Sequence, residues 1–254
     1  MIELEAGDAR VTIDPDAGGR VAQITVGGVD LLVDERSGGP LTWGCYPMAP
    51  WAGRVREGRF RFDDTAVSLP INLAPHAIHG TAFTDSWSVA DAGRDYCELA
   101  CDLRWQFGGR THQHLHLDEH GLTLMLSVLA TTSAMPAVIG WHPCFRAPQW
   151  SDLGFARMYT RDQHHIAVPT LVPPKPRPWD DCFLEPLGPL RFRQQHLTVT
   201  VDSDCDHWVV YDEQPHLLCI EPQSGPPDAF TIGGAARLEP GALLQRRMTI
   251  RWAS

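Results

Sequence analysis

The segment THQHLHLDEHGLTLMLSVLAT, residues 111–131, indicates most clearly which fold this 254-residue chain adopts. In its first half histidines occupy every second position and Leu115 and Leu117 lie between or after them as far as Asp118, and a second alternating run begins after Gly121. Alternation with a period of two is typical of strands that bury one face, and the DEHG stretch between the runs indicates a turn. The segment therefore predicts an antiparallel β-hairpin.

The same period-two alternation recurs along the chain in short runs bounded by Gly, Pro and Asp residues, and helical periodicity is nearly absent. Examples are ARVTIDP, RVAQITVGG, CELACDLRW, LTVTVDS, HWVVYDE and RRMTIRW. About fourteen such runs exceed what one open sheet usually holds, so two packed sheets are favoured. We expect an all-β fold, a large two-sheet β-sandwich, formed by a single domain over residues 1–254.

Residues 166–190 depart from this pattern, with seven prolines and no clear periodicity. Trp179 and Phe183 give the segment apolar surface to bury, so we expect a long ordered loop rather than a flexible linker. Long loops on a β scaffold often carry functional side chains.

The charge balance disfavours several classes of partner. The chain has 21 Lys and Arg against 31 Asp and Glu, a formal charge of −10. This weakens attraction to nucleic acid and anionic membranes, so we expect neither as a partner. With no signal-like start and no apolar run of about 18 residues, we expect a cytoplasmic protein. The sequence pattern does not distinguish a monomer from an oligomer, because an exposed sheet edge and a dimer edge look alike in sequence.

The cysteines show neither a disulfide framework nor the paired spacing of a zinc ribbon. We expect free thiols, mostly buried. They are Cys45, Cys97, Cys101, Cys144, Cys182, Cys205 and Cys219.

Two side chains with acid–base chemistry stand directly before a proline. Glu221 lies in CIEPQSGPPDA and His142 in GWHPCF. A following proline disfavours helix and holds each residue extended, and the turn-rich continuation after Glu221 predicts that its strand ends there. Taken singly, each is more simply a surface residue at a strand exit.

Two further stretches are loop-like and rich in polar side chains. PMAPWAGRV, residues 47–55, contains Arg54, and PHAIHG, residues 75–80, contains His76 and His79. Arg54 could be a solvated arginine lying over an aromatic ring, and His79 alone is more often structural.

Taken in order, PWAGR, HAIHG, GWHPCF, WDDCF and CIEPQSGPPDA resemble the aldose 1-epimerase (galactose mutarotase) family, and LEPG at 238–241 resembles its closing element. Several ordered motifs are far more specific than any one of them. The resemblance implies the galactose mutarotase-like supersandwich, with a monosaccharide bound in an open cleft across one sheet. It also implies an isomerase that needs neither a cofactor nor a metal.

The resemblance also implies roles for individual residues. Glu221 in the EP motif would be the general base and His142 in the HP-x-F motif the general acid. Arg54 and His79 would bind sugar oxygens, and Asp180, three residues before Phe183, would hold hydroxyl groups. Asp181 is the alternative to Asp180, because the two acids adjoin.

These roles meet the chemical needs of anomer interconversion. One base takes the proton of the C1 hydroxyl, one acid protonates the ring oxygen, and the opened aldehyde turns before the ring closes again. The base must be ionised while the acid is protonated, and a free histidine is mostly neutral at pH 7. We expect Glu221 and Asp180 to raise the pKa of His142, while Arg54 keeps the carboxylates charged.

Three other functions remain open from the sequence. A hexose-6-phosphate mutarotase would need a cationic pocket, for which Arg56, Arg59 and Arg61 are candidates. The second alternative is a non-catalytic carbohydrate-binding protein on the same fold. The third is a glycosidase that uses Asp180 and Glu221 as its carboxylate pair.

Two residue sets have competing interpretations. His112, His114 and His116 alternate, so they lie on one strand face and either point into solvent or bind a metal. Solvent is favoured, because neighbours on one face of a strand converge poorly on one ion. Trp43, Trp51, Trp141 and Trp179 flank the motifs and either pack in the core or offer flat faces to a sugar.

Overall fold

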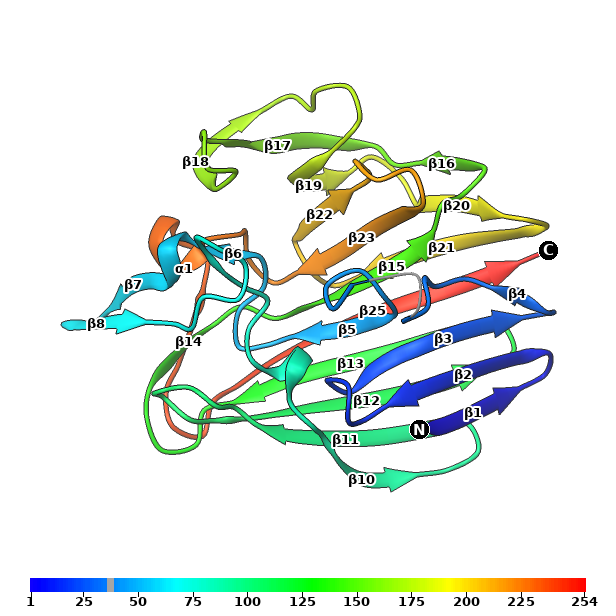
Figure 1. Cartoon of the computed structure of the whole chain (residues 1–254), viewed down its shortest axis with the longest axis horizontal. Coiled ribbons are helices and arrows are strands. Elements are labelled where there is room, and N and C mark those ends of the chain that lie inside the picture. The colour runs from blue at the N-terminus through cyan, green and yellow to red at the C-terminus, as the bar shows by residue number, and fades with distance from the viewer. Residues whose placement is uncertain (36–38) are drawn as a thin grey trace.

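The chain forms two large antiparallel sheets that pack face to face, as a computed structural model describes for residues 1–35 and 39–254 (Figure 1). The larger sheet has eleven strands. In spatial order they are β1 (Ile2–Ala6), β2 (Ala9–Asp14), β3 (Arg20–Val26), β5 (Cys45–Met48), β15 (Gly140–Arg146), β23 (Leu217–Gln223), β22 (His207–Tyr211), β19 (Asp180–Pro186), β17 (Phe155–Arg161) and β18 (Ala167–Val172), with β4 (Val29–Asp30) paired to β3.

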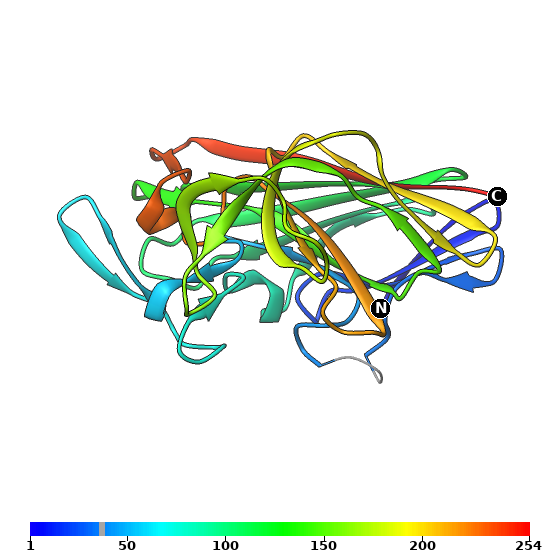
Figure 2. The same cartoon turned by 90° about the horizontal axis from the view of Figure 1, so that it is seen from above.

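The second sheet has eight strands and covers one face of the first (Figure 2). Its order is β10 (Ser88–Ala92), β11 (Tyr96–Asp102), β12 (Arg110–Asp118), β13 (Gly121–Leu129), β25 (Leu243–Ala253), β21 (Leu197–Ser203), β20 (Leu190–Gln194) and β16 (Trp150–Asp152). The expected all-β, two-sheet sandwich is thereby confirmed.

Short elements gather at one end of the sandwich, where the β7–β8 hairpin projects in both views (Figures 1 and 2). The two-stranded sheets are β6 (Arg54–Val55) with β9 (Ala77–Ile78), β7 (Arg59–Phe62) with β8 (Thr65–Ser68), and β14 (Met135–Ala137) with β24 (Ala236–Leu238). The helical turns are η1 (Arg56–Gly58), η2 (Ala82–Thr84) and α1 (Ala229–Ile232).

The predicted hairpin at 111–131 is present as β12 and β13. Its register pairs Asp118 with Gly121, and the Asp118 carboxylate accepts a hydrogen bond of 2.7 Å from the backbone N–H of His120. Such a bond from an aspartate to the chain two residues later stabilises a tight turn. Leu115 and Leu117 are buried, whereas the alternating histidines of β12 face away from the core.

The core lies between the sheets and draws apolar side chains from both of them, for example Val11 and Ile24 from one and Leu124 and Ile250 from the other. A buried hydrogen bond spans the core, in which the indole N–H of Trp141 donates to the side-chain oxygen of Gln113 at 3.0 Å. Trp141 on β15 therefore points into the core. Its neighbour His142 must point to the opposite face of the sheet.

All seven cysteines are free and buried, as expected.

Two expectations about where strands lie are wrong. The segment 166–190 is not one long loop, because residues 167–172 and 180–186 form β18 and β19 at the edge of the larger sheet. Four of the seven prolines lie in the connection between those strands, which spans 173–179.

Glu221 and His142 do not lie at strand exits. Strand β23 continues to Gln223 and β15 to Arg146, so both prolines lie inside central strands. The extended conformation that proline imposes fits a strand, and the neighbouring residues supply enough ladder bonds to carry each strand past it.

Within residues 1–35 and 39–254 we find no helix with the length and apolar character that crossing a membrane requires.

Candidate active site

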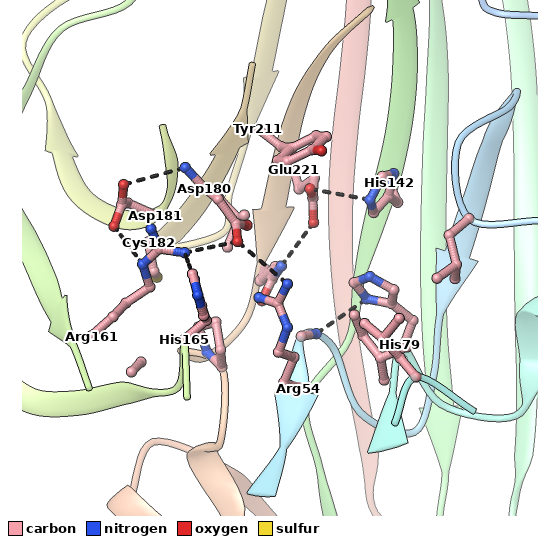
Figure 3. A pocket seen from close by; sticks show the side chains of 18 of the residues that line it. Arg54, His79, His142, Arg161, His165, Asp180, Asp181, Cys182, Tyr211 and Glu221 are labelled. Carbon is pink, nitrogen blue, oxygen red and sulfur yellow. Dashed lines mark hydrogen bonds and ion pairs between the residues drawn. The ribbon is translucent and has the colours of Figure 1, made fainter. Parts of the chain in front are cut away.

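Two neighbouring strands in the middle of the larger sheet bring Glu221 and His142 together. The register that pairs Gly140 with Gln223 and Cys144 with Cys219 places His142 opposite Glu221. His142 Nε2 lies 3.3 Å from Glu221 Oε1, and both side chains are almost fully buried (Figure 3). The second carboxylate oxygen, Oε2, accepts a hydrogen bond of 3.2 Å from the side-chain amide of Gln223.

Burial and proximity shift the pKa values of this pair. Burial raises the pKa of Glu221 to about 7, because an ionised carboxylate is poorly solvated there, although His142 opposes the effect. Burial alone would lower the pKa of His142, but the charges of Glu221 and Cys144 outweigh it and raise that pKa to about 9. The direction for His142 and the part of Glu221 agree with the expectation, whereas Cys144 takes the place expected for Asp180. For Glu221 the expectation was wrong, since Arg54 does not offset the cost of burial.

Arg54 and His79 approach the pair from the small β6–β9 sheet, where Arg54 pairs with Ile78. The backbone N–H of Gly53 donates to His79 Nδ1 at 3.3 Å. Gly53 has φ +70°, and a Cβ there would lie 2.8 Å from Pro227, so glycine allows this close approach. The pKa of His79 lies well below its ordinary value because the ring is buried near the charges of His142 and Arg54. His79 is therefore neutral, with Nδ1 as acceptor and Nε2 carrying the proton.

The far side of the site is a network of cations around two aspartates. Asp180 Oδ2 lies 3.3 Å from Arg54 and 2.7 Å from Arg161. Asp181 is buried, and its two oxygens lie 2.9 Å from Arg161 and 2.8 Å from Lys175. Figure 3 shows Asp180 turned toward Arg54 and Asp181 turned toward Arg161. Of the two acids, Asp180 is thus the one nearer Glu221.

These groups line a cavity of about 280 Å³, close to the lower end of the range of about 300–1,000 Å³ for small-molecule sites. All five residues expected from the sequence line it: Arg54, His79, His142, Asp180 and Glu221. Apolar walls come from Leu41, Leu73, Ile78, Ala167, Val209 and Pro227.

The four tryptophans that flank the motifs and the three arginines proposed for a phosphate site are not among the described residues that line this cavity. Trp43, Trp51, Trp141 and Trp179 are buried, and no tryptophan of the described chain lines the cavity. Their role is core packing. Arg56, Arg59 and Arg61 are also not among the described lining residues, and Arg56 instead pairs with Asp162 at 2.7 Å.

Side chains of the types that hold metals cluster in two places, and both clusters contain His142. One adds Cys144 and Cys219, and the other adds His79 and Glu221, with ligand atoms within 4.8 Å of one another. The three histidines of β12 belong to neither cluster in the described chain. Both ring nitrogens of His142 already contact neighbouring side chains, Nε2 that of Glu221 and Nδ1 that of Cys144.

Sequence reasoning missed several residues of this site. Gln223 could have been found, since it lies two residues after Glu221 and must share its strand face. Arg161 and Tyr211 also line the cavity, but no motif marks them. The pairing of β17 and β22 with β19 is what brings them there.

Comparisons with known proteins agree with this architecture. The family model described as Aldose 1-epimerase matches residues 1–251. Two Escherichia coli K12 proteins are similar in sequence. The uncharacterized protein YphB is 30% identical over 119 residues, 45% of this chain and 41% of that protein. The uncharacterized protein YihR is 26% identical over 274 residues, covering 91% of this chain and 86% of YihR.

A solved structure shares the fold over nearly the whole length. A galactose mutarotase-like protein from Clostridium acetobutylicum superimposes with a TM-score of 0.88 at 17% identity, covering 99% of this chain and 94% of that one. At this identity the likeness concerns the fold alone.

Proposed function

Because the chain belongs to the aldose 1-epimerase family, we propose that it is an isomerase that interconverts the α and β anomers of an aldose. The observation that carries this proposal is the buried acid–base pair. His142 Nε2 and Glu221 Oε1 are 3.3 Å apart in the wall of a cavity, with pKa values of about 9 and about 7.

The proposed reaction needs only proton transfers. Glu221 takes the proton of the C1 hydroxyl while His142 Nε2–H protonates the ring oxygen, and the bond between C1 and the ring oxygen breaks. The product is the open-chain aldehyde. After rotation about the C1–C2 bond, the former ring hydroxyl attacks the other face of C1, returning its proton to His142 while Glu221 protonates the carbonyl oxygen.

Three other side chains would hold the sugar. Arg54 and the Nε2–H of neutral His79 are donors to hydroxyl oxygens, and the free acceptor capacity of Asp180 suits hydroxyl protons. Asp180 is also fixed by two arginines, which holds its carboxylate in one position. Positioning of this kind keeps the C1 hydroxyl near Glu221.

The two pKa values define the pH range in which the pair is active. Glu221 works as a base only above about pH 7, and His142 works as an acid only below about pH 9. Activity should therefore be greatest between these values.

An uncharged aldose is favoured over a sugar phosphate. The basic residues that the sequence offered for a phosphate, Arg56, Arg59 and Arg61, are not among the described cavity-lining residues. The cations that do line it, Arg54 and Arg161, already contact Asp180.

The test is exchange NMR of anomeric protons, applied to glucose, galactose, other aldoses and glucose 6-phosphate. Wild type should accelerate exchange for at least one free aldose, and Glu221→Gln should lose about 10²–10⁴-fold of the rate. Glu213→Gln, at an exposed position, is the matched control and should retain it.

Other results would redirect the assignment. Acceleration for glucose 6-phosphate alone would replace the substrate, and release of nitrophenol from aryl glycosides would indicate hydrolysis. If no sugar exchanges faster but ligand-observed NMR detects binding, the protein is a binding module.

A further inference from the structure

A pair of thiols lies directly behind the imidazole of His142. Cys144 and His142 share one face of β15, and Cys219 and Glu221 share the same face of β23. The register pairs Cys144 with Cys219. Cys144 Sγ lies 3.3 Å from His142 Nδ1 and 3.9 Å from Cys219 Sγ.

This thiol pair, Cys144 and Cys219, is sealed from solvent. Both residues are 0% exposed and pack with Val33, Trp43 and Leu217. Away from water a hydrogen bond between Cys144 and the imidazole is not replaced by a bond to solvent, so the bond has a larger effect on the protonation of the ring.

A buried cation lies close to the pair. The guanidinium of Arg20 lies 4.1 Å from the ring of Trp43 and 4.9 Å from that of Tyr46, and Tyr46 stacks on His142. Its N–H groups donate to backbone oxygens, including that of Trp43 at 2.9 Å. Among the ion pairs of the described residues, none joins Arg20 to a carboxylate, and the charge of Asp14 acts on it without such a contact. A buried cation in this situation favours a negative charge nearby.

We propose, building on the proposed function, that Cys144 is a positioning residue whose thiolate accepts the Nδ1–H of His142. The imidazole then carries both protons, and its Nε2–H lies beside Glu221 in the wall of the cavity. Cys219 supports this state by donating its S–H to the Cys144 sulfur.

The direction of the Cys144 pKa supports the geometry. Burial by itself raises that pKa, but the hydrogen bond from Cys219, the imidazolium of His142 and the charge of Arg20 lower it to about 5. Cys219 takes the opposite direction, since its pKa is raised by burial and by Cys144, so it remains a donor.

The other charged or titratable groups around His142 come from four strands and the β9 loop. Glu221 on β23 is its partner at Nε2, and Tyr46 on β5 stacks on the ring. His79 packs edge-on, with ring centroids 5.0 Å apart, and is neutral. Arg54 and Asp180, on β6 and β19, pair with each other. None of these groups contacts Nδ1, so the effect of Cys144 is separable from theirs.

The test replaces the sulfur and follows His142 in two ways. Cys144→Ala should lower the pKa of His142, moving the basic limb of kcat/KM to lower pH by about one unit, a loss of about fivefold at pH 9. Cys144→Ser keeps an acceptor oxygen without the charge and should show the same shift. Cys97→Ala, which removes an equally buried thiol from the other sheet, should show none.

The second readout is the ¹H–¹⁵N spectrum of ¹⁵N-histidine-labelled protein, titrated without sugar. In wild type at pH 7.5, both nitrogens of His142 should be protonated, and in Cys144→Ala the titration should move to lower pH. Because this readout needs no activity, it judges the thiolate even if the protein is not a mutarotase.

The proposal is wrong if the basic limb and the titration are unchanged in both variants. It is also wrong if they move to higher pH, because a neutral thiol donating to Nδ1 would stabilise the unprotonated ring. If Cys144→Ala does not fold, the wild-type spectrum alone decides, since a singly protonated His142 at pH 7.5 would exclude the thiolate pair.

Discussion

Replacing Glu221 by glutamine should stabilise the protein at alkaline pH while removing its proposed base. The buried carboxylate has a pKa of about 7 against an ordinary value of 4.5. At about 1.4 kcal/mol per pH unit, this difference corresponds to about 3–4 kcal/mol. A carboxyl group whose folded-state pKa is raised favours folding while it is protonated, and that contribution is lost as the pH rises from 4.5 through 7.

His142 changes the balance in the same direction. Its pKa is raised from 6.5 to about 9, so the stability that it contributes is complete below 6.5 and is lost as the pH rises through 9. Glutamine cannot ionise, and without Glu221 the main cause of the raised His142 pKa is gone. The ionisation of Glu221 alone should therefore increase the free energy of unfolding of Glu221→Gln, relative to wild type, by about 2–3 kcal/mol between pH 5 and pH 8.5, and the loss of the His142 contribution adds to this increase.

Urea unfolding followed by tryptophan fluorescence at pH 5, 6, 7, 8 and 8.5 measures this change. Glu213→Gln, an exposed control, should follow wild type throughout. An equal stability difference between Glu221→Gln and wild type at pH 5 and pH 8.5 would refute the reasoning, because the ionised carboxylate would then carry no burial cost.

Further outcomes follow from other parts of the site and fold. The pH profile of kcat/KM should be bell-shaped with limbs near 7 and 9, and His142→Asn should remove the basic limb; a limb that persists would assign it to another group. Asp180→Asn should raise KM about tenfold with a smaller effect on kcat, measured by exchange NMR at several sugar concentrations, because it weakens an oriented acceptor rather than the acid–base pair. Gly80→Ala should lower the free energy of unfolding by about 1–3 kcal/mol, since φ is +80° and the new Cβ would lie 2.0 Å from the carbonyl oxygen of Ala49. Gly188→Ala, with open space around it, should stay within about 0.5 kcal/mol in the same urea experiment, and equal losses at both positions would contradict the steric account.

The sequence was a good guide wherever one strand face is buried. Period-two alternation in residues 111–131 predicted the hairpin, its turn and the inward leucines, because side chains on a pleated strand alternate between faces whatever lies around them. The ordered motifs likewise indicated which side chains to examine, and those side chains do line one cavity.

The same reasoning failed where local chemistry was overridden by the sheet. A proline usually argues against a central strand, so Glu221 and His142 were expected at strand exits. Strands on both sides of β15 and β23 supply the remaining ladder bonds, and the chain continues past Pro143 and Pro222.

What the sequence by itself determined is therefore the strand pattern and the identity of the polar groups, because both depend on residues close together in the chain. Only the tertiary structure decided which groups meet. The register of β15 with β23 sets Glu221 opposite His142 and Cys144 opposite Cys219, and the pairing around β19 brings in Arg161. Burial depends on the packing of distant segments, and burial is what shifts the pKa values of Glu221 and His142 and gives the pair its proposed chemistry.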